Sequence, residues 1–509
     1  MRVTALRLPE FRRRAGMYVL RSLACVAMGW LPLGTVAAGE PDPDPRFGAV
    51  EAYQRPQAAA ELGVGWDRLI IEWFRVQPLG SQHWLPVFPH GLHSRTAPDN
   101  RTYTNHITHP LSQNDWVADA RAASREVTAL LMGTPGWATE GVPVRGVPSG
   151  LYLPVQHPEN HWANFVRRMV GEHGRRIKHW IIWNEPDIAP DHPGAQFDGS
   201  VEDYYRLVKV AAMAAREVDP EAVIHLGALT FWHDVVYGRE PYLRRLLQVA
   251  MQDENAAEHG FFFDVATVHV YFNTESVYTI IAQQREILRE FGLQQPVWLN
   301  ETNAAPMDDP RHPWNDPLVA VTLRQQASFV IQSAVLAFAA GAERMAVYKL
   351  FDHVAPAHGL ESYGLIRSDG SLRPAATAYR VAVERLSGFR RVQPAAHPTH
   401  HLVTFVGASA VTHVAWAREA EPVTVHVAAN PGSAGAILVD QRGTVTHPVL
   451  EDGEYRLELP AAHCLEDGGE CIIGGEPQLL VEHLKCDPAR LAHQRKCVLW
   501  LAAGAGRVG

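Results

Sequence analysis

The sequence predicts an α/β chain in which a closed (β/α)8 barrel is followed by a smaller antiparallel β domain. Three observations indicate this: a length of 509 residues, eight alternations of strand-like and helix-like segments, and a change of pattern after Gly388. A barrel of this kind takes about 250 to 400 residues, which leaves room for a second domain. With 47% hydrophobic and 20% charged residues, the chain can bury a large core.

The barrel is expected over residues 46–388, where eight short apolar runs resemble parallel strands that are buried on both faces. These runs are Phe47–Tyr53, Arg68–Trp73, Val127–Met132, His179–Trp183, Val223–Leu229, Asp264–Tyr271, Pro296–Leu299 and Arg344–Leu350. Helical periodicity lies between them, as in Trp162–Val170, and the apolar segment Thr322–Ala340 ends at Gly341, a typical helix stop. A doubly wound open sheet is the alternative fold, but no glycine-rich phosphate-binding motif follows any predicted strand.

Residues 389–509 have the pattern of an antiparallel, sandwich-like β domain. Alternating runs are separated by turn residues such as Asn430-Pro431-Gly432. The runs expected to form strands are Leu402–Val406, Thr412–Trp416, Val423–Val427, Ala436–Val439 and Tyr455–Leu459. From Ala461 onward the chain contains four cysteines and is expected to be rich in loops.

The N-terminal residues 1–38 have the features of a cleaved export signal. Arginines precede an apolar stretch, Leu23–Val36, and the small residues Ala37 and Ala38 offer a cleavage site. Pro32 and Gly34 interrupt the apolar stretch, so no stable membrane span is expected after cleavage. The prediction is a secreted or periplasmic protein.

Charge and cysteine content narrow the range of partners and compartments. Removing residues 1–38 takes away six Arg and one Glu, which changes the formal net charge from −9 to −14. An acidic chain has no electrostatic basis for binding nucleic acid or anionic membranes. An even number of cysteines in an exported chain predicts disulfides, and the candidates are Cys464, Cys471, Cys486 and Cys497. A zinc site is the alternative, but these spacings differ from those of zinc fingers and ribbons.

Two glutamates lie where a barrel of this type carries its catalytic groups, at the carboxyl ends of strands. Glu185 follows the fourth predicted strand and Glu301 follows the seventh. Such a pair can face each other across the barrel mouth, as glycosidic cleavage with retention of configuration requires. Trp183 and Pro186 are apolar neighbours that favour a protonated Glu185, so Glu185 is the predicted acid/base and Glu301 the predicted nucleophile.

Other polar and aromatic residues are expected to support this pair. Arg68, inside the second strand, can hold the negative charge of Glu301, and Tyr271 can donate a hydrogen bond to it. Asn184 is placed to contact the 2-hydroxyl of a sugar. The remaining predicted substrate-binding residues are His269, Tyr348 and Trp137. Two alternatives stay open: Arg68 could pair with Glu51 or Glu72, and the polar residues of the sixth strand could simply cap it.

These motifs resemble those of glycoside hydrolase clan GH-A. The stretch His179-Trp-Ile-Ile-Trp-Asn-Glu-Pro-Asp187 is similar to the acid/base motif of the clan, and Pro296-Val-Trp-Leu-Asn-Glu-Thr302 is similar to its nucleophile strand. The segments most similar to family 39 are Gly65–Pro78, Thr134–Ala138, His269–Tyr271 and a tail made of Tyr348, Tyr363–Leu365, Asp369–Gly370 and Arg373–Pro374. That family includes relatives of β-xylosidase and α-iduronidase and bacterial exopolysaccharide hydrolases. The resemblance spans about residues 46–388.

The resemblance implies an acid/base role for Glu185, a nucleophile role for Glu301, substrate binding by Asn184 and charge stabilisation by Arg68. Two positions depart from the pattern. The eighth strand offers Tyr348 where many clan members place Trp, and Asn300 precedes the nucleophile where Thr or Ser is more usual. These departures concern the family and the substrate rather than the clan.

The predicted function is therefore hydrolysis of a β-linked oligosaccharide or polysaccharide by double displacement, without a cofactor or catalytic metal. The histidines lack the HExxH spacing of a zinc enzyme, and the acidic residues near Asp187 lack the spacing of a calcium loop. Alternatives are a non-catalytic carbohydrate-binding barrel in polysaccharide export or assembly, a transglycosylase, and a purely structural secreted protein.

Overall fold

A computed structural model describes residues 42–85, 116–312, 319–352, 362–464 and 471–485, together with the backbone of two short strands, β3 (Ser94–Thr96) and β4 (Thr102–Thr104). The expected export signal lies outside the described residues. No helix among those described is long and apolar enough to cross a membrane.

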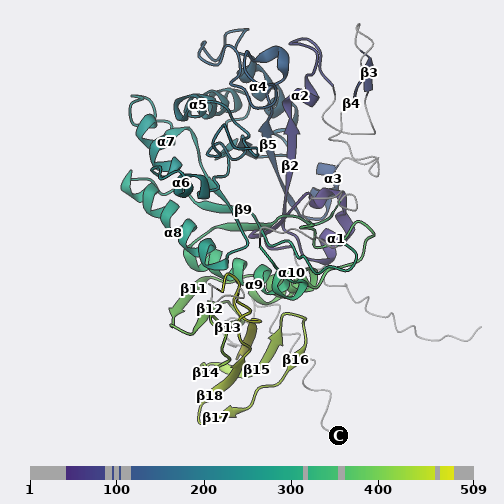
Figure 1. Ribbon diagram of the computed structural model, residues 1–509, viewed down its shortest axis with the longest axis vertical. Coiled ribbons are helices and arrows are strands. Elements are labelled where there is room, and N and C mark those ends of the chain that lie inside the picture. The colour runs from purple at the N-terminus through teal and green to yellow at the C-terminus, as the bar shows by residue number, and fades with distance from the viewer. Residues whose placement is uncertain are drawn as a thin grey trace, which may run out of the picture. The chain divides into compact units, whose positions relative to one another are not determined.

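Eight parallel strands form the barrel, as predicted (Figure 1). In chain order they are β1 (Phe47–Val50), β2 (Trp66–Glu72), β5 (Glu126–Met132), β6 (His179–Ile182), β7 (Val223–Leu226), β8 (Ala266–Tyr271), β9 (Val297–Asn303) and β10 (Arg344–Val347). Ladders join neighbouring strands in the order β7-β6-β5-β2-β1-β10-β9-β8. Parallel bridges of His225 to Val265 and of Leu229 to Val268 link the two ends of this sheet, so the barrel is nearly closed.

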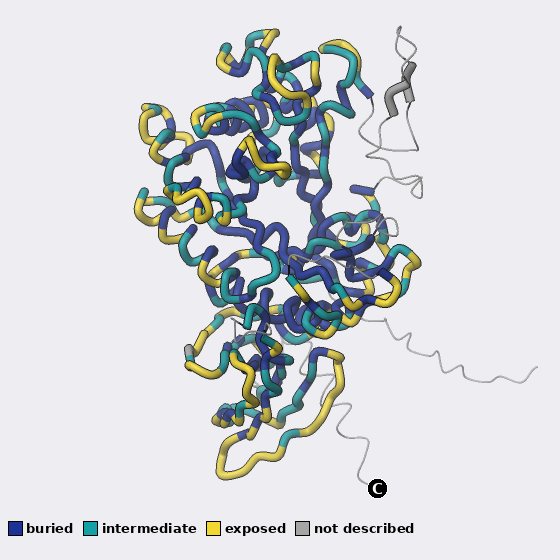
Figure 2. The backbone as a smooth tube through the Cα atoms, in the orientation of Figure 1, coloured by how far each residue is buried: buried dark blue, intermediate teal, exposed yellow. Residues whose placement is uncertain are grey.

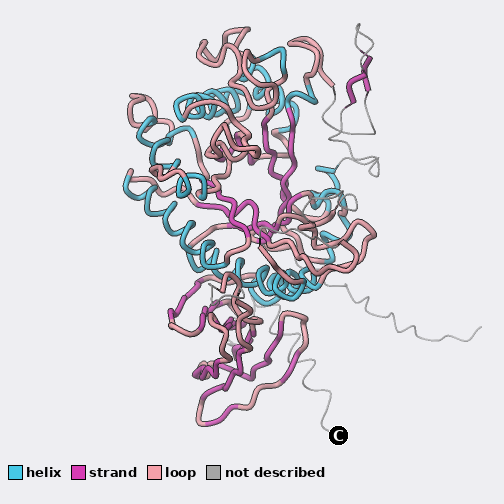
Figure 3. The backbone as a smooth tube through the Cα atoms, in the orientation of Figure 1, coloured by secondary structure: helices cyan, strands magenta, loops and turns pink. Residues whose placement is uncertain are grey.

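Helices and short helical turns connect the strands and lie around them (Figure 3). They are η1 (Ala52–Gln54), α1 (Pro56–Glu61), α2 (Trp73–Val76), α3 (Trp116–Ala122), η2 (Gly136–Ala138), α4 (His161–His173), α5 (Val201–Val218), α6 (Trp232–Val236), α7 (Tyr242–Ala250), η3 (Gly260–Phe262), α8 (Thr274–Glu290), α9 (Leu323–Ala340) and α10 (Pro374–Leu386). Except for α6, whose apolar side chains are exposed, these elements share one continuous apolar core with the strands, and Figure 2 colours these buried stretches dark blue.

Helix α9 shows how the local sequence sets these elements. Thr322 and Gln325 form a capping box at its start, and Gly341 ends it with a left-handed backbone (φ 89°). The helix is apolar on nearly all sides because it lies between the barrel and the β domain. Its Gln332 side chain is fully buried and bonds to Gly475 O (2.8 Å) and Gly474 N (3.0 Å) in the β domain.

The β domain contains two antiparallel sheets. One has the order β11-β12-β13-β19-β15-β16 and the other the order β14-β18-β17. The strands are β11 (Arg391–Ala396), β12 (His400–Val406), β13 (Ala410–Ala417), β14 (Val423–Ala428), β15 (Ser433–Asp440), β16 (Val445–Thr446), β17 (Leu450–Glu451), β18 (Glu454–Leu459) and β19 (Gln478–Leu484). Apolar side chains from both sheets form a second core between them.

One segment of the β domain differs from the sequence-based expectation, and one predicted feature of it is confirmed. Gln478–Leu484 was expected in a loop-rich region but forms β19, which pairs with both β13 and β15 in the interior of the larger sheet. Its apolar centre, Leu479–Val481, is buried on both faces, so it lacks the alternation that marks a half-exposed strand. Cys464 and Cys471 form a disulfide, as predicted, whereas Cys486 and Cys497 lie outside the described residues.

Candidate active site

The loop that follows β6 carries Glu185 toward the barrel mouth through an unusual backbone path. Trp183 and Glu185 both have left-handed backbone angles (φ 69° and 44°), which are unfavourable for residues with a Cβ. Packing holds this path, because the Trp183 side chain is fully buried and its indole N–H donates to Gln196 O at 2.8 Å. The Glu185 amide donates to Ala228 O at 3.1 Å, which joins the turn to the segment after β7.

A β-bulge in β9 directs Glu301 into the barrel. Leu299 pairs with Val268 and Glu301 pairs with His269, so Asn300 is the extra residue. Trp298 points inward, where its ring contacts His179 and His225 of other strands. Regular alternation would place Glu301 on the opposite face from Trp298. The bulge shifts that register by one residue, which brings the carboxylate to the inner face.

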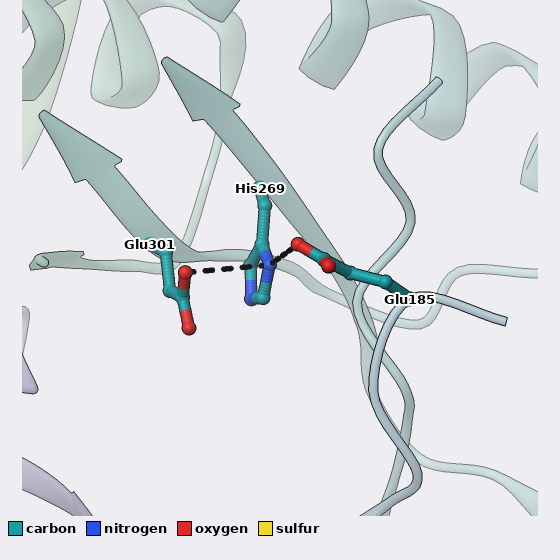
Figure 4. A group of neighbouring side chains, drawn as sticks. All are labelled: Glu185, His269 and Glu301. Carbon is teal, nitrogen blue, oxygen red and sulfur yellow. Dashed lines mark hydrogen bonds and ion pairs between the residues drawn. The ribbon is translucent and has the colours of Figure 1, made fainter. Parts of the chain in front are cut away.

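Glu185, His269 and Glu301 meet at one point (Figure 4). His269 Nδ1 lies 2.7 Å from Glu185 Oε1 and 3.5 Å from Glu301 Oε2. One oxygen of each carboxylate and the histidine nitrogen all lie within 4.8 Å of one another. The fold thus brings together two glutamates that are 116 positions apart in the chain.

Glu301 is buried among groups that stabilise its charge. The Arg68 guanidinium bonds to Oε1, and the Tyr271 hydroxyl donates to Oε2. Burial alone would raise the pKa of Glu301, but the charge of Arg68 and the hydrogen bonds from Arg68 and the Tyr271 hydroxyl bring this pKa below its ordinary value. Glu301 is therefore ionised at neutral pH.

Contacts on the other ring nitrogen of His269 indicate its tautomer. Arg68 Nη1 lies 3.3 Å from His269 Nε2. A guanidinium only donates hydrogen bonds, so Nε2 is the acceptor and Nδ1 carries the proton. We infer that His269 donates from Nδ1 to Glu185 Oε1. The histidine therefore links the arginine that holds Glu301 to the second carboxylate.

Glu185 is held by neutral donors. Gln196 Nε2 donates to Glu185 Oε2 at 2.8 Å, and Asn184 Nδ2 donates to Gln196 Oε1 at 3.0 Å. Gln196 comes from the loop between β6 and α5, where the sequence shows no periodicity or motif. Sequence analysis did not identify it, and its role follows only from the folded loop.

The two carboxylates open into a cavity of about 520 Å³. Its described lining residues are Arg68, Ile70, Leu130, Met132, Asn184, Glu185, Gln196, Tyr271, Phe272, Glu301, Tyr348 and Tyr363. Tyr271, Tyr348 and Tyr363 contact one another, with ring centroids 5.3 to 6.1 Å apart. Phe272 and Tyr363 were not among the predicted site residues, although Tyr363 lies in a segment similar to family 39.

The structure brings most of the predicted site residues together. The cavity is lined by Asn184, Arg68, Tyr271 and Tyr348, and His269 contacts both carboxylates. Arg68 contacts Glu301 rather than the alternatives: Glu51 lies 3.6 Å from Lys349, and Glu72 pairs with Arg75.

Trp137 does not join this group. It is not among the described residues that line the cavity, its indole N–H donates to Gln77 O at 2.7 Å, and its ring contacts Trp73 and His161. The turn after β5 folds back over α2 and α4, so a tryptophan close to a strand end in sequence lies away from the two carboxylates.

Among the described residues, one group of side chains could hold a metal ion, and it is the same set of Glu185, His269 and Glu301. Arg68 already bonds to Glu301 and also approaches His269. A fixed guanidinium opposes a second cation at this position. The guanidinium therefore makes this group of side chains a poor site for a resident metal ion.

The fold and the site together define a class: a (β/α)8 barrel with two glutamates converging at the carboxyl ends of its strands. Comparison with protein-family models and with curated protein sequences finds no match. The fold is similar to solved structures of clan GH-A glycoside hydrolases, as the sequence motifs indicated.

Among these structures is a family 39 glycoside hydrolase from the gut symbiont Bacteroides cellulosilyticus WH2, with 16% sequence identity and a TM-score of 0.61, covering 87% of this chain and 81% of that chain. A GH30 endoxylanase from Clostridium papyrosolvens C71 has 12% identity and a TM-score of 0.54, with coverages of 87% and 98%. The GH39 enzyme from Xanthomonas axonopodis pv. citri has 13% identity and a TM-score of 0.51, with coverages of 87% and 95%.

Proposed function

We propose that this protein is a retaining glycoside hydrolase. The observation that carries the proposal is the separation of the two carboxylates, which offer oxygens within 4.8 Å of each other in one cavity. Retaining enzymes hold their carboxyl groups about 5–5.5 Å apart, whereas inverting enzymes need about 6.5–9.5 Å to admit a water molecule between carboxylate and sugar.

In the first step, Glu301 attacks the anomeric carbon while the bond to the leaving oxygen breaks. Glu185 gives its proton to that oxygen, and a glycosyl ester forms on Glu301. Arg68 and Tyr271 support this role because they keep Glu301 ionised and fix both of its oxygens.

In the second step, Glu185 takes a proton from water as the water oxygen attacks the anomeric carbon and frees Glu301. Two features support Glu185 for the proton transfers. Glu185 accepts hydrogen bonds from Gln196 and, in the inferred tautomer, from His269, and both donors are uncharged. Its carboxyl group also lines the cavity. Each oxygen accepts one hydrogen bond, which leaves a position for the transferred proton.

The substrate is proposed to be a β-linked oligosaccharide or polysaccharide. We assign Asn184, Tyr348 and Tyr271 to substrate binding because they line the cavity, and His269 because it contacts both carboxylates. Trp137 stays a candidate only for a more distant part of a long substrate. Transfer to a sugar hydroxyl instead of water is the second candidate reaction, because it would use the same covalent intermediate. The Cys464–Cys471 disulfide is compatible with a secreted or periplasmic location.

The test combines product stereochemistry with a leaving-group series. We expect proton NMR during hydrolysis of an aryl glycoside to show that the first-formed sugar keeps the configuration of the substrate. Glu185→Ala should lose most activity on 4-methylphenyl glycosides, which need protonation, and retain more on 2,4-dinitrophenyl glycosides. Azide should restore part of its turnover by forming a glycosyl azide. Glu61→Ala, an exposed control on α1, should behave as wild type. Inversion of configuration would contradict the proposal.

A further inference from the structure

The cavity that contains the two glutamates has two chemically different sides. Its hydrogen-bonding side is formed by groups that already contact one another, namely Asn184, Gln196 and Glu185 after β6, and Tyr271 and Glu301 on β8 and β9. The side that faces β8 and β9 across the barrel comes from β2 and from β5, which pairs with β6. The reacting carbon must lie at the hydrogen-bonding side, because both carboxylates are there.

Apart from Arg68 of β2, which bonds to Glu301, the described residues that β2 and β5 contribute to the cavity lining have apolar side chains. Ile70 follows Arg68 on the same face of β2, and it pairs in register with Leu130 of β5. Met132 continues this face toward the barrel mouth. Ile70 and Met132 are partly exposed, and Leu130 is buried beneath them. These three side chains form a continuous apolar wall, to which we refer as the β2–β5 wall.

Only some sugars can bind against the β2–β5 wall without losing hydrogen bonds. A hydroxyl group that faces it gives up water and finds no hydrogen-bond partner on Ile70, Leu130 or Met132. A methyl group or hydrogen in the same place has no hydrogen bond with water to lose, and it buries apolar area. Sites of this kind discriminate between substrates that differ by one hydroxyl group, to about 10- to 100-fold.

We propose that the sugar bound in this cavity is a deoxy sugar, whose edge toward the β2–β5 wall carries a methyl group or hydrogen in place of a hydroxyl. The proposal rests on the proposed glycosidase function and adds the class of sugar to it. The hydroxyls that the substrate does carry would then lie on the side of Asn184 and Tyr271.

Matched pairs of 4-nitrophenyl glycosides test this proposal. The pairs are D-fucoside with D-galactoside, D-rhamnoside with D-mannoside, and 6-deoxy-D-glucoside with D-glucoside, so that the members of each pair differ only by the hydroxyl group on carbon 6. In the pair with the preferred ring stereochemistry, we expect kcat/KM of the deoxy member to exceed that of its partner by about 10- to 100-fold. Equal or faster cleavage of the hydroxylated member in every cleaved pair would overturn the proposal while leaving the glycosidase function intact.

A binding measurement separates the two proposals. If no glycoside is cleaved, the glycosidase function fails, and calorimetry with the same pairs as methyl glycosides still tests the wall. Tighter binding of a deoxy member by about tenfold or more supports the assignment, and equal or no binding of all pairs refutes it.

Variants of the wall provide an internal control. Met132→Gln keeps the length of the side chain and adds hydrogen-bonding groups. It should therefore reduce the ratio of kcat/KM for the deoxy member to that of its partner by about threefold or more. Met213→Gln, at an exposed position of α5, should leave the preference unchanged. Matching thermal unfolding of the two variants establishes that both are folded. An unchanged preference in folded Met132→Gln would contradict the proposal.

Discussion

The two ends of the barrel both bring histidines and charged side chains into contact, but they differ in chemistry. At the carboxyl ends of the strands, His269 lies between Glu185 and Glu301. At the amino ends, His179 Nδ1 lies 2.8 Å from His225 Nε2, and both rings contact Trp298. Trp298 in turn donates to Glu343 at 2.6 Å and lies under the Arg344 guanidinium.

The protonation states of the buried side chains explain how the two ends of the barrel differ in chemistry. Burial lowers the pKa of His179 to about 4 and lowers the pKa of His225 well below its ordinary value, so both rings are neutral near pH 7. At the other end, Arg68 keeps Glu301 charged although the carboxylate is buried. A pair of neutral rings sealed by tryptophan serves packing. A charged carboxylate maintained in a cavity costs stability, and such a cost is typical of a site of chemistry.

Replacing one glutamate at each end gives the largest contrast. Glu301→Gln keeps the size of the side chain and removes the nucleophile, so kcat on aryl glycosides should fall by at least about 10⁴-fold. Glu343→Gln, at the amino ends of the strands, should leave kcat unchanged. Steady-state kinetics of both variants measure this contrast. Full activity in Glu301→Gln would remove the basis for the proposed mechanism.

Removing one arginine at each end should change the pH profile at one end only. Arg68→Met takes away the charge that lowers the pKa of Glu301, so this carboxylate becomes protonated at higher pH. The acidic limb of the kcat/KM profile should therefore move to higher pH by about 1–3 units. Arg344→Met should leave the limb in place. A limb that stays unchanged, or moves to lower pH, in Arg68→Met would contradict the role given to Arg68.

A smaller effect is expected at Gln196, which donates a hydrogen bond to Glu185 but takes no part itself in the bonds that form and break. Gln196→Ala removes the hydrogen bond to Oε2, and kcat/KM for substrates with poor leaving groups should fall about tenfold. Activated dinitrophenyl glycosides should be less affected, because their departure needs no proton. Gln248→Ala, at an exposed position of α7, is the matched control. The same loss on both kinds of substrate would show that Gln196 acts on general folding instead.

Substitutions at the amino ends of the barrel strands should affect the stability of the protein but not its turnover. Because the folded pKa of His179 (about 4) lies below its ordinary value of 6.5, the unfolded chain takes up a proton first as pH falls. This stabilising contribution is complete above pH 6.5 and is lost between pH 6.5 and 4. His179→Leu should therefore reduce the pH slope of the unfolding free energy in this window by up to about 1.4 kcal/mol per pH unit.

Urea denaturation of wild type and His179→Leu between pH 4 and pH 7 measures this slope, with kcat at neutral pH as the second reading. Equal slopes in the two proteins would show that His179 titrates normally. A large loss of kcat with unchanged stability would remove the distinction between the two ends of the barrel.

The sequence was sufficient to predict the barrel and the position of the two glutamates in it, because both follow from local patterns. Apolar runs define buried strands, and a carboxylate two residues after such a run lies near the carboxyl ends of the sheet. The bulge at Asn300 was not predictable, since a bulge depends on the register of two neighbouring strands. Gln196 reaches the site through a loop without periodicity, and Trp137 is turned away by tertiary packing. Neither outcome leaves a signal in the local sequence.

Trapping of the covalent intermediate tests the central claim most directly. A 2-deoxy-2-fluoro glycoside with a dinitrophenyl leaving group slows the second step, so the glycosyl ester should accumulate. Mass spectrometry after peptic digestion should place one fluorosugar on the peptide that contains Glu301, and Glu301→Gln should acquire none. A label on any other residue, or efficient hydrolysis with inverted product and no label, would contradict the account.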